Sequence, residues 1–288
     1  MPESTDRTLL SIGHGYSARE LSKHLLAQDW RVIGTTRSAD KTEEIRASGA
    51  EPVIWPDADL SPLFAEATHL LLSAGPEEDG DPVLKQLDGK IPANDIVWAG
   101  YLSTTGVYGN RDGGWVDETS DCNPATKRGQ WRLDAERTWA ETGLPLHIFR
   151  LAGIYGPGRG PFAKVRNGTA RRIIKENQIF SRTHVEDIAR ILHASIEHPN
   201  SGAIYNVCDN YPAPPEDVIA HAAELLGLPL PEAVRFEDAD MSPMARSFYA
   251  ESKRVSNRRV REELGVEMLY PSYREGLAAL LRSETQGV

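Results

Sequence analysis

The feature that most constrains this chain is a regular alternation of short apolar runs with segments of helical periodicity, from residue 8 to residue 151. Apolar runs of about four to eight residues indicate buried strands when helical segments separate them. Strands covered by helices on both faces form a parallel sheet, and right-handed crossovers wind that sheet in both directions. The expected strands are 8–12, 30–35, 52–55, 69–73, 95–102 and 147–151, with helices at 17–27, 40–48 and 127–142.

The chain changes character after Gly153. Residues 155–172 read YGPGRGPFAKVRNGTARR, where glycine and proline favour loops and short helices. We therefore predict an α/β fold, a Rossmann-type doubly wound parallel sheet with a smaller, helix-rich C-terminal substrate domain. The later helices are expected at 186–197, 214–226, 253–264 and 273–282, and one more strand at 203–207.

Length and charge narrow the possible functions. The 288 residues correspond to roughly two domains at about 150 residues each. The chain has 32 basic and 42 acidic residues, which gives a formal net charge of −10. Because binding to nucleic acid requires clustered Lys and Arg, we expect no nucleic-acid partner. A local basic pocket could still hold a small anion.

Cysteine usage and the N-terminal segment point to an ordinary cytoplasmic protein. Cys122 and Cys208 are the only cysteines, and no CxxC or HExxH spacing occurs. We therefore expect neither a disulfide framework nor a metal site. The first apolar run is about five residues long, too short for a signal peptide or a membrane span. We expect a soluble protein without a membrane partner.

A glycine-rich turn follows the first expected strand. It has the form G-x-G-x-x-A, in which the first glycine permits the tight turn and the second lets a pyrophosphate approach the backbone. The phosphates would then lie at a helix N-terminus, where free N–H groups favour an anion. The alternative is a turn with chance glycines. The predicted cofactor loop is Gly13, His14, Gly15, Tyr16, Ser17 and Ala18.

The end of the second strand bears on which dinucleotide binds. NAD sites usually carry an acidic residue there for the ribose hydroxyl. Here Thr36, Arg37 and Ser38 occupy that place, and no acid occurs before Asp40. A guanidinium binds a phosphate as a two-pronged donor, so the residues predict NADP, with NAD as the less favoured cofactor. Alternatively, Arg37 is a solvated loop charge.

Small residues also follow the fourth strand. Ser73, Ala74 and Gly75 would let the adenosine half of a dinucleotide lie against the sheet edge, although strand ends often carry small residues for other reasons. We place the NADP-binding domain at residues 1–155 and a smaller substrate-binding part at residues 156–288. Helix 185–198 and strand 203–207 are expected to pack back on the first domain.

Four motifs together resemble those of a known family. They are the glycine loop, LSTTGVYG at 102–109, RLAGIYGPGR at 150–159 and HVEDIARI at 184–191. Their order and spacing are similar to those of the extended short-chain dehydrogenase/reductases, which include the NAD-dependent epimerase/dehydratases and nucleotide-sugar epimerases. The motifs spread over about two thirds of the chain, and the last 80 residues or so match only loosely.

The resemblance implies a catalytic hydroxyl at Thr104 that hydrogen-bonds the reacting oxygen of the substrate. It also implies a tyrosine–lysine pair four residues apart, with a glutamate four residues later. Glu136 fits that glutamate, so the lysine position holds Arg132 and the tyrosine position holds Arg128. Arg132 could keep the positive charge and the ribose contact. Arg128 cannot shuttle a proton, because a guanidinium stays protonated. The pattern resembles the atypical branch of the family.

Other groups could then supply the proton. Tyr108 and Tyr155 each end a motif at the carboxyl edge of the sheet, where ligands bind. His184 could also shuttle a proton near neutral pH. Each of the three could equally be a packed, structural side chain. Of these groups we assign Tyr108 to catalysis, beside Thr104 and Arg132, and we assign Tyr155 and His184 to the substrate site.

The segment 159–182 is basic in an otherwise acidic chain. Relatives that bind nucleotide-diphosphate sugars hold the diphosphate with basic residues of the corresponding region, and the alternative is a solvated basic face. A second basic cluster at residues 246–261 is interrupted by acids, which indicates a helix surface. With Thr105 added, the predicted substrate residues are Thr105, Tyr155, Arg159, Arg171, Arg182 and His184.

These expectations combine into one main hypothesis and two rivals. The main hypothesis is an NADP-dependent oxidoreductase or epimerase/dehydratase-like enzyme of the atypical extended type, acting on a small anionic substrate such as a nucleotide sugar. One rival is an NADP-binding sensor that has lost catalysis, and the other is an interaction scaffold. A homodimer could form through the helix at 127–142, where Trp131 and Trp139 could face a partner or pack inward.

Overall fold

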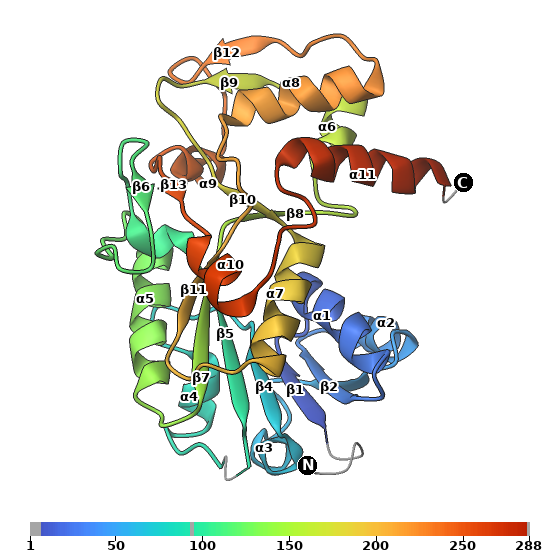
Figure 1. Cartoon of the computed structure of the whole chain (residues 1–288), viewed down its shortest axis with the longest axis vertical. Helices are drawn as coiled ribbons and strands as arrows, with labels where there is room; N and C mark the ends of the chain where they lie inside the picture. Colours follow the sequence, from blue (N-terminus) through green and yellow to red (C-terminus); the bar gives the residue numbers. More distant parts are fainter. Residues whose placement is uncertain (1–6, 93–94, 287–288) are drawn as a thin grey trace.

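The computed structural model of the chain describes residues 7–92 and 95–286. Among these residues, seven parallel strands form the central sheet in the order β3–β2–β1–β4–β5–β7–β11 (Figure 1). This order is that of a Rossmann fold, so the predicted α/β class is confirmed. The strands are β1 (Thr8–Ile12), β2 (Arg31–Thr36), β3 (Glu51–Ile54), β4 (His69–Leu72), β5 (Trp98–Thr104), β7 (Leu146–Leu151) and β11 (Ile204–Val207).

Helices cover both faces of this sheet. On one face, α1 (Tyr16–Leu26) and α7 (Val185–Glu197) bury apolar side chains that recur every three or four residues, such as Ile188, Ile191 and Leu192. On the other face, α3 (Ser61–Glu66), α4 (Pro82–Gln86) and α5 (Lys127–Ala140) pack against a separate apolar cluster. Trp139 of α5 is fully buried in that cluster, so it packs inward.

The second half of the chain forms a layer at the carboxyl end of the strands (Figure 1). The helices α6 (Phe162–Arg166), α8 (Pro215–Leu226) and α11 (Tyr273–Gln286) share an apolar core of their own. Meanwhile α7 packs against α1, and β11 pairs with β7 in the main sheet. Among the described residues, no helix is long and apolar enough to span a membrane.

Short strand pairs connect the two halves, and the sequence patterns did not predict them. The pairs are β8 (Gly153–Tyr155) with β10 (Arg182–His184), β9 (Arg172–Ile174) with β12 (Ala233–Arg235), and β6 (Trp115–Val116) with β13 (Arg254–Val255). The last pair shortens the helix predicted over 253–264. Residues 254–255 are held as a strand, and α10 begins only at Arg258 and ends at Leu264. Between β13 and α8, residues Pro243–Phe248 form α9.

The segment after β2 also differs from its expectation. A helix was predicted over 40–48, but the chain forms a single 3₁₀ turn at Ala39–Lys41 before α2 (Thr42–Ala47). A second 3₁₀ turn, η2 (Thr105–Tyr108), follows β5 and carries one of the predicted motifs. Its position at the carboxyl edge of the sheet makes it part of the candidate site.

Candidate functional site

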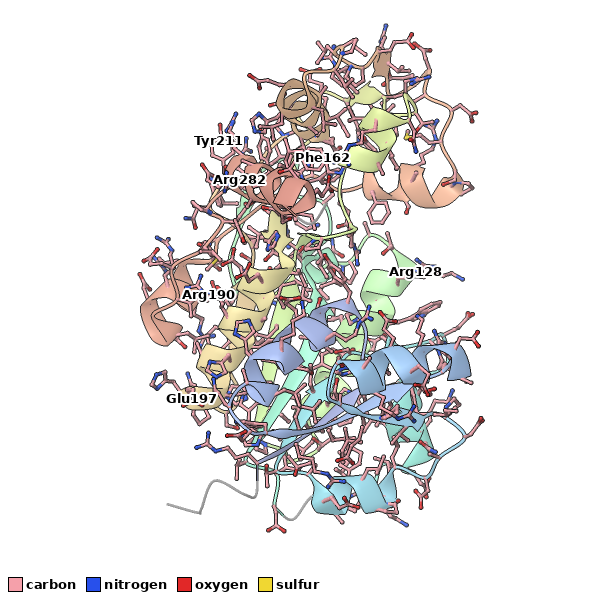
Figure 2. The ribbon with its side chains drawn as sticks, turned by 90° about the vertical axis from the view of Figure 1, so that its right-hand side faces the viewer. Arg128, Phe162, Arg190, Glu197, Tyr211 and Arg282 are labelled. Atoms are coloured by element: carbon pink, nitrogen blue, oxygen red, sulfur yellow. The ribbon has the colours of Figure 1, made fainter. Side chains whose placement is uncertain are left out.

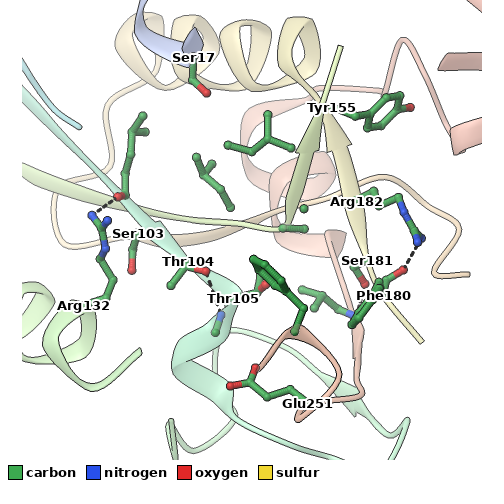
Figure 3. Close-up of a pocket in the computed structure, with 18 of the residues that line it drawn as sticks. Ser17, Ser103, Thr104, Thr105, Arg132, Tyr155, Phe180, Ser181, Arg182 and Glu251 are labelled. Atoms are coloured by element: carbon green, nitrogen blue, oxygen red, sulfur yellow. Dashed lines mark hydrogen bonds between the residues drawn. The ribbon is translucent and has the colours of Figure 1, made fainter. Parts of the chain in front are cut away.

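A cleft of about 900 Å³ lies between the carboxyl edge of the sheet and the C-terminal layer. Figure 3 shows Thr104 and Thr105 near its centre, with Arg132 on one side and Arg182 and Tyr155 on the other. The glycine loop, the end of β5 and the first turns of α5 form one wall, and β8, β10 and the segment around Glu251 form the other. The cleft thus joins three of the four motifs found in the sequence, namely the glycine loop, residues 102–109 and residues 150–159.

The glycine loop has the geometry expected of a phosphate-binding turn. Gly13 has φ +80°, and a Cβ atom there would lie 2.7 Å from the backbone nitrogen of Ala74. Gly15 is different, because a Cβ atom there would meet only the Gly13 carbonyl oxygen, at 3.7 Å. The chain itself therefore does not require a glycine at position 15. The open space beside Gly15 fits a pyrophosphate at the N-terminus of α1.

The side chains of the loop divide between the cleft and the protein interior. Gly13, Gly15, Tyr16, Ser17 and Ala18 line the cleft. His14 does not line it, since its ring is buried against Gly34. Burial, together with the nearby Arg19, lowers the pKa of His14 to about 4, so the imidazole is neutral. The side chain of His14 therefore packs inside the fold, and this placement does not support the predicted cofactor contact.

Arg37 lies in the loop after β2, outside the cleft lining. Its side chain is exposed, and it makes no hydrogen bond or ion pair within residues 7–92 and 95–286. The loop is shaped by Thr36, whose hydroxyl oxygen accepts a hydrogen bond from the Ser38 backbone N–H at 3.2 Å. Arg37 is thus free to meet a charged group from solvent, as the prediction of a 2′-phosphate contact requires.

The segment after β4 reaches the cleft beside the glycine loop. Ser73 lines the cleft, and its hydroxyl is buried without a hydrogen-bond partner in the described part of the chain. Ala74 is the residue that Gly13 approaches closely. A Cβ atom at Gly75 would lie 3.6 Å from Nη2 of Arg132, an ordinary van der Waals distance, so this segment lies directly beside the arginine.

Thr104 ends β5 and caps the 3₁₀ turn that follows. Its Oγ1 accepts a hydrogen bond from the backbone N–H of Gly106 at 3.1 Å, which leaves its own O–H able to donate into the cleft. Thr105 lines the cleft beside it and is 9% exposed. The neighbouring Ser103 also lines the cleft, but its hydroxyl donates to the buried carboxylate of Glu136. This geometry suits Thr104 to contact a substrate oxygen.

Arg132 projects from α5 toward the ends of β4 and β5. Its Nη1 donates to the carbonyl oxygen of Leu102 at 2.8 Å and to the Tyr101 hydroxyl at 3.3 Å, and the guanidinium lies over the Tyr101 ring. These contacts hold a positive charge at the inner end of the cleft. Arg128, one turn earlier, also lines the cleft and lies at the end of α5 that faces the C-terminal layer (Figure 2).

Tyr108 lies in a buried polar network instead of the cleft. It is fully buried, its hydroxyl donates to Oδ1 of Asn206 at 2.7 Å, and it accepts from Nη1 of Arg150 at 3.0 Å. Burial raises the pKa of Tyr108 to about 12. A tyrosine with both hydrogen-bonding positions occupied and no access to the cleft is not placed to protonate a substrate. This geometry does not support the catalytic role predicted for Tyr108.

His184 is also engaged inside the fold. Its Nδ1 accepts a hydrogen bond from the backbone N–H of Glu186 at 3.2 Å and so caps α7. Its ring packs against Tyr155 and Tyr270 and does not line the cleft. Burial lowers the pKa of His184. The predicted contact with substrate therefore does not follow from this placement.

Of the remaining predicted substrate residues, three line the cleft and one lies outside it. Tyr155, Arg159 and Arg182 line the cleft. The Tyr155 hydroxyl donates to the carbonyl oxygen of Ser272 at 3.4 Å, and burial raises its pKa. The Arg159 guanidinium lies over the Tyr16 ring, beside the glycine loop. Arg171 lies outside the cleft, where it donates to the carbonyl oxygens of Gly168 and Ala170.

The cleft also contains charged residues that were not singled out as site residues from the sequence, among them Lys253 and Glu251. Lys253 was assigned to a helix surface, but only 8% of it is exposed, and its Nζ donates to the Gly109 carbonyl oxygen at 2.9 Å. It also forms an ion pair with Glu251, which points into the cleft (Figure 3). Burial lowers the pKa of Lys253, although Glu251 opposes that shift. Pairing of β13 with β6 brings this lysine inward, and no local pattern encodes that pairing.

Within residues 7–92 and 95–286, no group of three or more His, Cys, Asp or Glu side chains could hold a metal ion. Cys122 and Cys208 are both free thiols, and Cys208 is buried. The chemistry available to the cleft is therefore that of hydroxyl groups, cationic side chains and one carboxylate.

Comparison with known proteins places this fold and cleft in context. Protein YeeZ of Escherichia coli (strain K12) is 30% identical over 277 residues, which is 90% of this chain and 95% of that protein. The solved structure of a conserved protein of unknown function from Silicibacter pomeroyi DSS is 59% identical. It covers 96% of this chain and 99% of its own, with a TM-score of 0.93. No protein-family model matches the chain.

A nucleotide-sugar enzyme shares the fold across nearly the whole length. UDP-glucuronic acid 4-epimerase from Bacillus cereus, solved in complex with NAD, superposes with a TM-score of 0.76 at 18% identity and covers 97% of this chain and 99% of its own. This chain belongs to the same family as protein YeeZ, and its fold is that of the extended short-chain dehydrogenase/reductases. Compared with the motif of those enzymes it is unusual, because Arg128 stands at the position of the motif's tyrosine.

Proposed function

We propose that this protein is an oxidoreductase or epimerase-like enzyme that binds a nicotinamide dinucleotide, with preference for NADP, and acts on a small anionic substrate. The observation that carries the proposal is that one cleft contains the open Gly15 turn, Thr104 and Arg132 together. A dinucleotide along this edge of the sheet would place its pyrophosphate at Gly15 and its 2′-phosphate near Arg37. The bound cofactor supplies hydride chemistry at its nicotinamide ring.

The residues of this chain would then bind and orient the reactants. The Thr104 hydroxyl, which is free to donate, would hydrogen-bond the reacting oxygen and polarise its bond to carbon. Arg132, fixed by Leu102 and Tyr101, would hold the nicotinamide ribose in place of the usual lysine. Arg159 would approach the pyrophosphate from above the Tyr16 ring. Each role follows from a side chain that faces the cleft.

We also propose that Lys253 donates the proton that the reacting oxygen of the substrate receives. Among the cleft residues described, Tyr155 already donates its hydroxyl to Ser272, and Arg128 cannot release a proton. The Lys253 ammonium lines the cleft, and burial lowers its pKa, which makes it a better proton donor than an exposed lysine. Lys253→Met is expected to lower turnover about a hundredfold while cofactor binding persists. Equal turnover in the variant would remove Lys253 from this role.

The first experiment is a set of thermal unfolding curves with NADP, NADPH, NAD and NADH. A ligand that binds only the folded state raises the unfolding midpoint by mass action. We expect the largest rise with NADPH, and a protein whose midpoint is unmoved by all four dinucleotides would not have the proposed function. Thr104→Ala should keep the rise, whereas turnover on a panel of carbonyl compounds and nucleotide sugars should be lost.

A sensor without turnover is the second candidate, and Arg128 favours it. A guanidinium at the tyrosine position removes the family's usual proton donor. Consumption of NADPH absorbance in the substrate panel distinguishes the two functions. Binding of NADPH with no consumption on any substrate would favour the sensor.

A further inference from the structure

The Arg182 side chain extends into the cleft with most of its hydrogen-bonding capacity unused. Arg182 begins β10, and its Nη1 donates to the carbonyl oxygens of Phe180 and Ala213, both at 3.0 Å. Its other guanidinium nitrogens make no hydrogen bond within residues 7–92 and 95–286. Figure 3 shows this arginine beside Tyr155, across the cleft from Arg132. Two carbonyl contacts fix the guanidinium but leave its charge unpaired.

No carboxylate neutralises this charge in the described part of the chain, where Arg182 forms no ion pair. Asp209 is one nearby acid, since its backbone N–H donates to the Arg182 carbonyl oxygen at 2.6 Å, and Glu216, whose pKa is raised by burial, is another. Burial raises the pKa of Asp209 to about 8, so its carboxyl group is largely neutral at pH 7. A desolvated cation without a counterion is costly, and an anionic ligand would offset that cost.

The surroundings of Arg182 are apolar and aromatic. Such a wall suits a flat, apolar body better than a hydrated sugar or ribose. Phe248 is 65% exposed, which is unusual for so large an apolar side chain and leaves it able to cover a ligand. The apolar residues that line this end of the cleft are Tyr155, Ile179, Phe180, Val218, Phe248, Tyr273 and Leu277.

The other basic residues of segment 159–182 do not gather around Arg182. Arg166 pairs with Glu284, Arg172 donates to the Pro231 carbonyl oxygen, and Lys175 donates to that of Tyr249. Only Arg159 and Arg182 of this segment line the cleft, and Arg159 lies by the glycine loop. A diphosphate, which normally takes several cations, would therefore meet one arginine here, with the Glu251 carboxylate in the same cleft.

We infer that the substrate is a monocarboxylate with a flat apolar or aromatic body, whose carboxylate pairs with Arg182. The two free nitrogens on the fork match the two oxygens of a carboxylate. The reacting carbonyl group would lie toward Thr104, between Arg182 and Arg132. This inference rests on the proposed function for its reaction, but the carboxylate subsite can be tested without turnover.

The test uses the full chain, with and without saturating NADPH, and three probes: cinnamate, its neutral analogue cinnamamide, and uridine diphosphate. Dissociation constants come from ligand-observed NMR titrations up to millimolar concentration. We expect cinnamate to bind about tenfold or more tightly than cinnamamide, because the charge-assisted contact is lost in the amide. No cinnamate binding, equal binding of the amide, or tighter binding of uridine diphosphate would overturn the inference.

Two variants separate the subsite from a general effect of charge. Arg182→Gln should weaken cinnamate about tenfold and leave cinnamamide unchanged, whereas Arg171→Gln, an exposed arginine of the same segment, should change neither. Unaltered cinnamate binding in Arg182→Gln overturns the assignment. If that variant does not fold, the comparison of cinnamate with cinnamamide on the unaltered protein still tests the inference.

The proposed function can be tested separately from this inference. Its readout is the NADPH-dependent rise of the unfolding midpoint, which Arg182→Gln should preserve. A protein that binds cinnamate through Arg182 but shows no response to any dinucleotide would keep the subsite and lose the oxidoreductase. A protein that responds to NADPH but not to cinnamate would keep the oxidoreductase and lose the subsite.

Discussion

Arg150 of β7 and Glu136 of α5 form an ion pair beneath the cleft, with Nη2 and Oε2 2.8 Å apart and side chains that are 5% and 4% exposed. The carboxylate also accepts from Ser103, and the guanidinium also donates to the Tyr108 hydroxyl. The pair therefore ties α5, which carries Arg128 and Arg132, to β7, and the contact with Ser103 ties it to the end of β5 that carries Thr104. These contacts hold this wall of the cleft in position.

Removal of one partner should leave the other as an uncompensated buried charge. Glu136→Ala is expected to lower the free energy of unfolding by about 3–5 kcal/mol. Glu141→Ala, at an exposed site just past the end of the same helix, should change it by less than about 0.5 kcal/mol. Urea denaturation of both variants measures the difference. Equal stabilities would mean that the pair does not support the fold.

Much of the fold could be predicted from the sequence because its signals are local. Apolar runs located the seven strands of the main sheet to within a few residues, and the G-x-G-x-x-A spacing located the turn before α1. Thr104 and Arg132 were predicted from the resemblance of their motifs to those of a known family, and both line the cleft. The strands and the glycine turn could be predicted because neighbours along the chain determine their conformation.

Other parts of the site depend on contacts between distant segments. Tyr108 belongs to a motif at the strand edge, yet Asn206 and Arg150 draw its hydroxyl into the interior. Lys253 lies in a basic stretch, but the pairing of β13 with β6 buries it. The basic side chains of segment 159–182 also do not gather at one place, because some of them pair with distant residues, as Arg166 does with Glu284. No pattern within one segment encodes these pairings.

The two glycines of the cofactor loop should respond differently to alanine. Gly15→Ala is expected to change the free energy of unfolding by less than about 1 kcal/mol, since its Cβ atom would meet no atom closer than 3.7 Å. That Cβ atom would occupy the space of the pyrophosphate, so the rise in midpoint with NADPH should be lost. Thermal unfolding with and without NADPH measures both quantities.

Gly13→Ala is the matched control for this experiment. With φ +80° and a contact of 2.7 Å to Ala74, it should destabilise the protein even without cofactor, by about 1–3 kcal/mol or more. A Gly15→Ala variant that still binds NADPH as tightly as the unaltered protein would contradict the assignment of the loop.

Arg37 is expected to determine the choice between NADPH and NADH. Its exposed guanidinium has no partner in the described part of the chain, so a 2′-phosphate would gain a charge-assisted contact without breaking another. Arg37→Ala should weaken NADPH by about tenfold or more and leave NADH nearly unchanged. Calorimetric titration gives both dissociation constants. Equal weakening of the two cofactors would remove the structural reason for an NADP preference.

Asp209 should make the stability of the protein depend on pH. Burial raises its pKa to about 8 in the folded state, well above the ordinary value, so the folded protein favours the neutral carboxyl group. Its contribution is fully present below about pH 4 and is lost as the pH rises toward about 8. Asp209→Asn stays neutral and can still accept the Tyr211 N–H, so its stability relative to the unaltered protein should increase from about pH 5 to about pH 8. Urea denaturation at both pH values tests this, with the exposed Asp57→Asn as control; a stability difference that does not change with pH would show that Asp209 ionises normally.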